Sequence, residues 1–346
     1  MTQFPFKAGA SALALGAALA ALPAVAQETL VINSFGGAYE EAHRALVIEP
    51  FEEMHDVEIE VVTAYSADAL AQLRAQRDNP QFDVIHFSGG QEVIAAEEGL
   101  LVPIQPDELS TYGEMYPFAV DGIEQGRGPV YSVAAVGLLY NTEAVEEAPT
   151  SWTDLQDERF ADHIVLTDIS NTYGLLGLLM INRVAGGDLS NIQPGLDVVS
   201  GMLDDAVIVK SSPEIQQNFA QNDAWLAPYA QDYAHTLRQA GLPVAFVQPE
   251  EGSPAVFITA NVVAGRPNTE LAKAFVDFSL RQEAQIGWAE ALRYSPTNAE
   301  AELPESLQDE VLYGAEAIEG LVRFDPVVVN DKRPEWTDMW NRTIAQ

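Results

Sequence analysis

Hydroxyl, aromatic and glycine residues stand where three predicted strands end. They occupy residues 34–39 (SFGGAY), 63–66 (TAYS) and 88–90 (SGG). Glycine lets a ligand come close to the backbone, and aromatic rings offer it a flat apolar surface. These residue types predict a place where a small molecule is held rather than transformed.

Catalytic patterns are absent from the sequence. The chain has no HExxH motif and no GxSxG elbow, and its histidines are scattered: His43, His55, His86, His163 and His235. A secreted hydrolase with His86 as base and Ser88 as nucleophile is the remaining enzymatic alternative. We therefore expect neither catalytic residues nor a metal site nor a cofactor.

Strand and helix patterns alternate along the N-terminal half. Residues 29–33, 57–62 and 82–87 read as strands, and residues 68–77 as an amphipathic helix. Such alternation predicts an α/β fold with a mostly parallel sheet flanked by helices. Ligands of such sheets bind beyond the carboxyl ends of the strands, where the three segments above lie.

The chain is long for one core, so two lobes are expected. Residues 130–140 (VYSVAAVGLLY) and 255–264 (AVFITANVVA) are extended runs that predict two crossing strands, with Gly137 able to bend the first. The predicted division is lobe 1 at 27–133 plus 262–300, and lobe 2 at 134–261 plus 301–346. The lobe that carries residues 301–346 stays open.

The N-terminus has the pattern of an export signal. Lys7 precedes an apolar run at 8–21, and Ala-Val-Ala follows at 24–26, which predicts a cleavable signal peptide over residues 1–26. The chain has no cysteine, which excludes a disulfide, a thiolate metal site and a lipid-modified cysteine. We expect a soluble periplasmic protein without a lipid anchor.

The chain is strongly acidic, with a formal net charge of -35 and only four lysines. Nucleic acid is excluded as a partner, because its phosphates would be repelled. An acidic surface that is solvated in salty surroundings explains this charge, and attraction of a cationic ligand is the alternative.

Six segments together resemble the spermidine/putrescine type of periplasmic solute-binding proteins, which feed ABC importers. They include SFGGAYEEAHR at 34–44, FDVIHFSGG at 82–90 and VYSVAAVGLLYNTEAV at 130–145; the others lie at 151–170, 223–237 and 268–298. The resemblance implies the two-lobed type II periplasmic binding fold with two crossing strands as a hinge. It also implies a small-molecule solute and a membrane permease as partners, and we expect a monomer.

The resemblance further implies which residues meet the solute. They come from loops of both lobes: Ser34, Gly37, Tyr39, Tyr65, Ser88, Gly89, Asp168, Asn171, Tyr173, Trp225, Tyr229, Asp232, Thr259, Asn261 and Tyr294. Trp225 and Tyr229 are four residues apart, a spacing that on a helix is also typical of the core. Trp336 and Trp340 have the same spacing and are expected to anchor a last helix rather than to bind.

The chemistry of this set favours an organic cation. Aromatic faces and carboxylates attract an ammonium group, and Arg293 is the cation that adjoins a candidate loop. Polyamine binders usually carry an acid in the second crossing, which VFITAN at 256–261 lacks, so a smaller or singly charged amine fits better.

The alternative is a small carboxylate or aminophosphonate. It would be held by backbone amides of the Gly-Gly turns, with Arg293 or Arg127 as counter-ion. A ferric-ion binder is disfavoured, because the sequence has no adjacent tyrosines.

Overall fold

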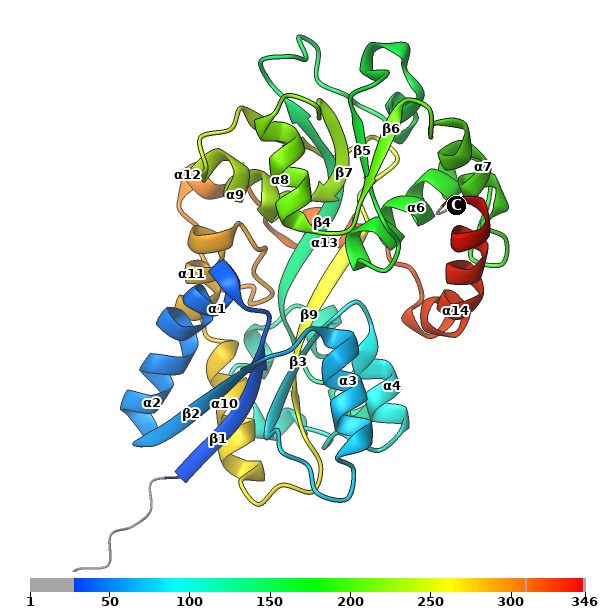
Figure 1. The fold of residues 1–346 in the computed structure, drawn as a ribbon. Helices are drawn as coiled ribbons and strands as arrows, with labels where there is room; N and C mark the ends of the chain where they lie inside the picture. The colour runs from blue at the N-terminus through cyan, green and yellow to red at the C-terminus, as the bar shows by residue number, and fades with distance from the viewer. Residues whose placement is uncertain (1–27, 309, 345–346) are drawn as a thin grey trace, which may run out of the picture.

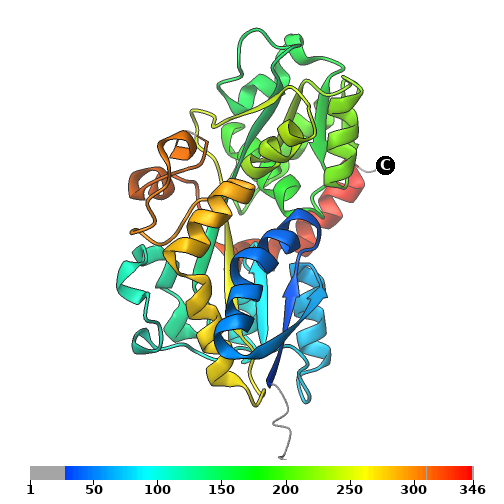
Figure 2. The ribbon, with the colours of Figure 1, turned by 90° about the vertical axis from the view of Figure 1, so that its left-hand side faces the viewer.

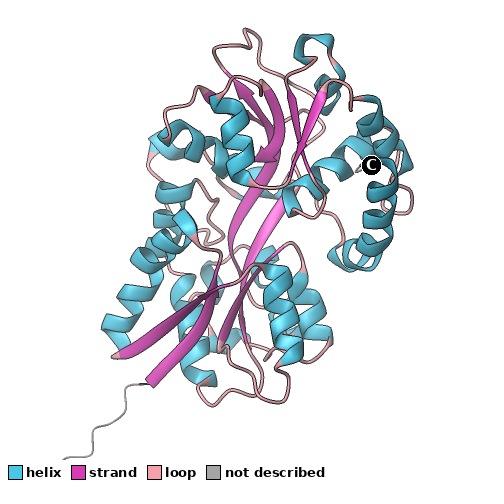
Figure 3. Ribbon diagram, viewed as in Figure 1, coloured by secondary structure: helices cyan, strands magenta, loops and turns pink. Residues whose placement is uncertain are grey.

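The computed structural model describes residues 28–308 and 310–344. The chain forms two α/β lobes joined by two long strands, which run between them at the centre of Figure 1. Helices cover both lobes, as the colouring of Figure 3 shows. The predicted signal peptide lies outside the described residues.

The first lobe is built on three parallel strands, β1 (Glu28–Ser34), β2 (Val57–Thr63) and β3 (Val84–Ser88). Its helices are α1 (Gly37–His43), α2 (Glu49–His55), α3 (Ser66–Ala75), α4 (Gln91–Glu97), α5 (Pro117–Val120) and α10 (Thr269–Ser279). A π-helical turn, Arg44–Ile48, joins α1 to α2. Each of the three predicted strands is present, with small shifts of its ends.

The second lobe repeats this plan. Its strands β5 (Ile164–Thr167), β6 (Ala206–Val209) and β7 (Leu226–Ala230) are parallel, and β8 (Val244–Val247) pairs with a crossing strand. Its helices are α6 (Thr172–Val184), α7 (Gln193–Gly201), α8 (Ser212–Ala220) and α9 (Gln231–Gln239).

The crossing strands are β4 (Val130–Asn141) and β9 (Ala255–Val262). They pair with each other antiparallel, and they link the lobes in the order β2-β1-β3-β9-β4-β7-β5-β6. The antiparallel pairs between named strands all involve β4 or β9, so the sheet is mixed as a whole and parallel within each lobe. The predicted type II α/β architecture is confirmed.

Gly137 lies where β8 approaches β4 closely. A Cβ atom at this position would lie 2.5 Å from the carbonyl oxygen of Val247, because β8 packs closely on β4 there. Glycine is therefore needed at position 137 for the approach of β8.

The C-terminal segment contacts both lobes. It contains α11 (Gln282–Leu292), α12 (Glu305–Gln308), α13 (Ala315–Glu319) and α14 (Pro326–Thr343). In α14, Asn330 Nδ2 donates to the Gly90 carbonyl of lobe 1 at 2.9 Å, and Trp340 Nε1 donates to Asp168 Oδ2 of lobe 2 at 3.0 Å. Figure 2 shows α11, in gold, beside α1, in blue.

A hydrophobic core of buried residues extends through both lobes and includes the helix anchors Trp152, Trp288, Trp336 and Trp340. Within residues 28–308 and 310–344, no helix has the length and apolar character needed to cross a lipid bilayer.

Candidate functional site

Four tyrosines from distant parts of the chain gather between the lobes. We call Tyr39, Tyr173, Tyr229 and Tyr294 the tyrosine cluster. The Tyr173 and Tyr229 rings meet edge to face at 4.9 Å. Tyr39 stacks on Trp288 with ring centroids 4.9 Å apart, and Tyr294 lies 6.0 Å from the same indole. Lobe 1, lobe 2 and the segment after α11 thus each contribute a ring.

Asp232 is the acid of this cluster. It lies in the first turn of α9, immediately after β7. Burial and, after it, the negative charge of Asp232 raise the pKa of Tyr173 and of Tyr294 well above the usual tyrosine value. Burial raises the pKa of Tyr229 to about 12, with Asp232 again contributing. The carboxylate therefore lies close enough to these rings to act on them electrostatically.

The Asp232 carboxylate has an unmet hydrogen-bonding capacity. Its Oδ1 is buried and finds no hydrogen-bond partner among the described residues. Burial raises the pKa of Asp232 to about 7. A buried charge without a partner is costly, so this position is suited to a ligand that supplies a positive hydrogen-bond donor.

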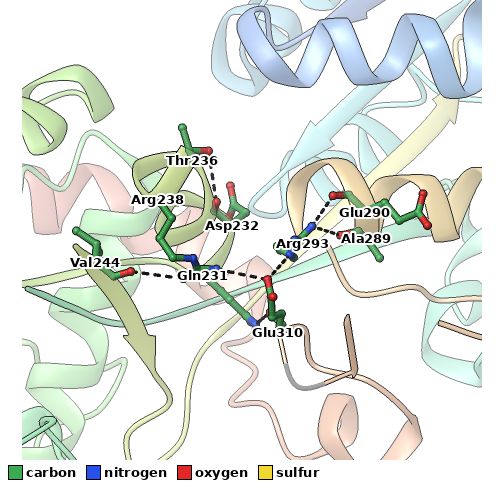
Figure 4. A network of polar contacts seen from close by, with 9 residues as sticks. All are labelled: Gln231, Asp232, Thr236, Arg238, Val244, Ala289, Glu290, Arg293 and Glu310. Atoms are coloured by element: carbon green, nitrogen blue, oxygen red, sulfur yellow. Dashed lines mark hydrogen bonds and ion pairs between the residues drawn. The ribbon is translucent and has the colours of Figure 1, made fainter. Parts of the chain in front are cut away.

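Arg293 does not neutralise Asp232. Figure 4 shows that Arg293 and Arg238 both turn to Glu310, with Arg293 Nε 2.6 Å and Arg238 Nη2 3.5 Å from Glu310 Oε2. The one dashed line at Asp232 joins its backbone oxygen to Thr236. Arg293 is thus engaged as an ion-pair partner, which removes it as the expected counter-ion of an anionic solute.

Three predicted residues of lobe 1 lie at the ends of β1 and β2. Ser34 ends β1, and its buried Oγ has no partner within the described chain. Gly37 begins α1 with a φ of 53°. Tyr65 precedes α3, is 64% exposed and stacks on Phe35 at 6.4 Å, so it offers an aromatic surface to solvent.

Other predicted site residues form hydrogen bonds within the protein. Ser88 Oγ lies 3.2 Å from Ser66 Oγ, and the Ser88 amide donates to the same Ser66 oxygen at 2.8 Å. Asn171 caps α6 by accepting from the Tyr173 amide at 2.8 Å. Asn261 fixes the crossing strand, because it donates to Ile85 and accepts from the Gly128 amide.

Asp168 is hydrogen-bonded to the C-terminal helix α14. Its Oδ2 accepts from Trp340 and its Oδ1 from the Ser170 amide. Burial acts to raise the pKa of Asp168, but these hydrogen bonds outweigh it and the pKa is lowered. The carboxylate is therefore ionised and partnered within the described chain.

Trp225 is not brought to the tyrosine cluster. It precedes β7, whose first residue Leu226 pairs with Ile164 at the start of β5, and the cluster lies near the opposite ends of these strands. Its ring stacks on His163 at 3.8 Å and borders a surface cavity with Arg159 and Phe160. The helical reading of the Trp225 to Tyr229 spacing is wrong, because this segment is the strand β7.

A second feature lies between the lobes, and we call it the interlobe cavity. Its volume is about 370 Å³, and Gly89 and Thr259 are the predicted site residues that line it. Gly89 meets the second lobe here, since a Cβ on it would lie 3.1 Å from Thr172 Cγ2. Several other lining residues were not predicted from the sequence: Glu92, Phe118, Phe257, Arg323 and Arg333. They come from separate elements, and no local pattern links them.

The geometry gives no support to catalysis by His86 and Ser88. His86 is buried, its Nδ1 lies 3.0 Å from the Asn33 carbonyl oxygen, and burial lowers its pKa to about 4. Ser88 Oγ is paired with Ser66 instead. Over the described part of the chain, no group of three or more His, Asp or Glu side chains is arranged to hold a metal ion.

Comparison with known proteins identifies the family. The model of bacterial extracellular solute-binding proteins matches residues 47–315. The gamma-aminobutyric acid-binding protein of Pseudomonas aeruginosa is 25% identical over 96% of this chain and 95% of its own length. The spermidine/putrescine-binding periplasmic protein of Escherichia coli is 23% identical over 63% of this chain and 64% of its own.

A solved structure of an ABC transporter protein from Clostridium perfringens has the same fold. It superposes with a TM-score of 0.77 at 25% identity and covers 91% of this chain and 99% of its own. The protein is thus a solute-binding component of an ABC importer, which delivers a small molecule to a permease, and it is not an enzyme. The chain belongs to the family of bacterial extracellular solute-binding proteins.

Proposed function

We propose that this protein captures a small organic cation, a polyamine or another amine-bearing solute, in the periplasm and presents it to its import permease. The observation that carries the proposal is the buried Asp232 Oδ1, which lacks a partner in the described chain and belongs to a carboxylate that acts electrostatically on the tyrosine cluster. An ammonium group there would receive a charge-assisted hydrogen bond from the carboxylate and cation–π contact from the rings.

The arrangement also indicates how binding closes the protein. Tyr39 belongs to lobe 1, whereas Tyr173, Tyr229 and Asp232 belong to lobe 2. A solute held by both sets contacts all of them only when the lobes are together. Binding therefore favours the closed arrangement by the difference in these contacts.

The test compares solutes and variants by calorimetry. Wild-type protein is titrated with n-butylamine, 1,4-diaminobutane and the neutral 1-butanol. Asp232→Asn should weaken binding of both amines about tenfold or more, which corresponds to about 1.4 kcal/mol or more. Glu290→Gln is the matched control, because it removes one negative charge from an exposed position on the neighbouring α11.

Two results would refute the proposal. One is binding of the neutral alcohol as tightly as the amines, and the other is unchanged amine affinity in Asp232→Asn. Equal loss in Glu290→Gln would assign the effect to long-range charge rather than to the site.

A small carboxylate or aminophosphonate is the second candidate solute. Arg127 lines the interlobe cavity together with Gly89 and Gly90, which supports the alternative in which backbone amides and an arginine hold an anion. A calorimetric preference for carboxylates or phosphonates over amines would favour this candidate.

A further inference from the structure

Two histidines are buried side by side in the core of lobe 1. His43 ends α1 and is 1% exposed, and His86 lies in β3 and is 0% exposed. Their ring centroids are 4.8 Å apart, with the two ring planes at 88°. Phe275 lies 6.1 Å from His43 and 6.5 Å from His86, and Trp288 lies 5.7 Å from His43. We call His43 and His86 the imidazole pair.

Hydrogen bonds to Asn33 fix the position of the hydrogen on His86. The Asn33 side-chain nitrogen donates to the carbonyls of Ala64 and His86, each at 3.0 Å, so its Oδ1 is an acceptor. His86 Nδ1 lies 3.0 Å from the Asn33 carbonyl oxygen and 3.2 Å from Oδ1. Since both neighbours are acceptors, Nδ1 carries the hydrogen and Nε2 is the bare nitrogen. A further proton therefore binds at Nε2.

The imidazole pair has unmet hydrogen-bonding capacity. Neither His86 Nε2 nor His43 Nδ1 finds a partner among the described residues. Burial and, after it, the positive charges of His86 and Arg44 lower the pKa of His43. Burial also lowers the pKa of His86 to about 4, although its hydrogen bond to Asn33 acts in the opposite direction. Both rings are therefore neutral at neutral pH.

The elements around the pair turn rings toward it rather than carboxylates. The titratable neighbours are Tyr39, 5.7 Å from His43, and Tyr131, 5.8 Å from His86, and burial raises the pKa of both tyrosines. Strand β9 has no ionisable side chain. The charged residues of α1, η1, α10 and α11 are paired elsewhere or exposed: Glu40 with Arg44, Lys273 with Glu108, Asp277 with Ser110 and Thr111, and the exposed Glu41, Glu270, Glu283 and Glu290.

The pair lies directly behind one ring of the tyrosine cluster. Tyr39 precedes His43 by one turn of α1, and its hydroxyl is hydrogen-bonded to the hydroxyl of Tyr131, whose ring meets His86 edge to face. A buried charge without a partner is costly. A proton on His86 therefore favours an arrangement in which α1 leaves β3 and water reaches the imidazole.

We propose that the imidazole pair is an acid-sensitive switch in lobe 1: a proton taken up at His86 Nε2 displaces α1 from β3, and Tyr39 leaves the tyrosine cluster with it. The inference goes beyond the proposed function and does not use Asp232. The stability that the neutral pair contributes is complete above the usual histidine pKa of about 6.5 and is lost as the pH falls toward about 4. The buried Asp232 has the opposite effect, because its own pKa is raised.

The test is hydrogen exchange of the unliganded protein between about pH 7 and about pH 4.5, corrected for the intrinsic rates. Protection of the amides at 40–48, in α1 and the π-helical turn, should fall about tenfold per pH unit below about pH 6, since each extra proton bound by the open state has this effect. Protection of α8 in lobe 2 should fall less.

His86→Asn should abolish the tenfold loss, because its amide keeps a donor near the position of Nδ1 and takes up no proton. His55→Asn is the matched control, because His55 is an exposed histidine on α2 of the same lobe. It should lose protection as wild type does. Wild-type loss in folded His86→Asn overturns the proposal.

Wild-type protein supplies a second test that does not depend on the folding of a variant. In an NMR titration of the histidine side chains, the protonated form of His86 should appear only together with the loss of protection at 40–48. Protonation of His86 while α1 stays protected overturns the switch. Asp232→Asn should retain the wild-type loss, and a loss that disappears in this variant assigns the effect to the solute site instead.

Discussion

Asp232 differs from most acids of this chain because burial raises its pKa to about 7. Near neutral pH about half of the molecules carry this proton, whereas an exposed carboxylate is fully ionised. The group is therefore neutral below this range and charged above it. Its proton must leave before the carboxylate attracts an ammonium group.

This titration predicts a pH dependence of binding. Affinity for n-butylamine should rise from about pH 5.5 to about pH 8 as Asp232 ionises, and calorimetry at several pH values measures it. In Asp232→Asn the residual affinity should be flat over this interval. A wild-type profile that is flat, or that falls with pH, contradicts the assignment.

Stability of the unliganded protein should change in the opposite direction. The folded pKa of Asp232 lies above the unfolded value of about 3.9, so its stabilising contribution is complete below that value and is lost as pH rises through about 7. Asp232→Asn should therefore raise the melting temperature more at about pH 8 than at about pH 5.

At the residue scale, the sequence predicted the types of side chain at the site better than the hydrogen-bond partners of those side chains. Tyr39 follows β1, a strand that the sequence pattern predicted, whereas Tyr229 and Asp232 belong to β7 and to the first turn of α9 after it, and the Trp225 to Tyr229 spacing did not reveal this strand. Ser88 and Asn261 bind other parts of the protein, because their partners are set by packing between distant segments. The actual distribution of hydrogen bonds requires the three-dimensional structure.

Helix α14 acts as a third connection between the lobes, beside β4 and β9. Asn330 in its first half donates a hydrogen bond to lobe 1, and Trp340 in its second half donates one to lobe 2. The sequence left this segment unassigned, since an amphipathic helix shows which face is buried but not the partner. Because this segment contacts both lobes, its sequence could not show which of the two lobes carries residues 301–346.

The Trp340 hydrogen bond can be tested by paired substitutions. Trp340→Phe removes the N–H group that donates to the ionised Asp168. It should lower the free energy of unfolding by about 1.5–3 kcal/mol, the usual contribution of a hydrogen bond to a charged group. Trp225→Phe is the matched control, because Trp225 Nε1 is buried without a partner in the described chain and its loss removes no hydrogen bond. Thermal unfolding of both variants gives the comparison, and an equal loss in the two would contradict the role of the bond.

At the scale of the whole molecule, the formal net charge of -35 acts on the folded state. The architecture was predictable because the α/β alternation and the crossing runs are local patterns of apolar residues. The interlobe cavity was not predictable, since its wall combines segments more than 200 residues apart.

The net charge predicts a salt effect on stability. Raising sodium chloride from about 0.1 M to about 1 M shortens the screening length from about 10 Å to about 3 Å. Self-repulsion of the acidic surface should weaken, and the melting temperature should rise by at least a few degrees. Titration with sucrose controls for solvent effects other than screening. A melting temperature that falls as salt is added would show that self-repulsion is unimportant.

The surroundings of Trp288 have a consequence for the fluorescence of the protein. Its indole is buried, stacks on Tyr39 and has no hydrogen-bond partner for Nε1 within the described residues. Indole fluorescence responds to nearby charge and to the packing of neighbouring rings. A cation that enters beside Tyr39 and Tyr294 therefore alters the emission of Trp288, and the molecule reports its own occupancy without a dye or an introduced label.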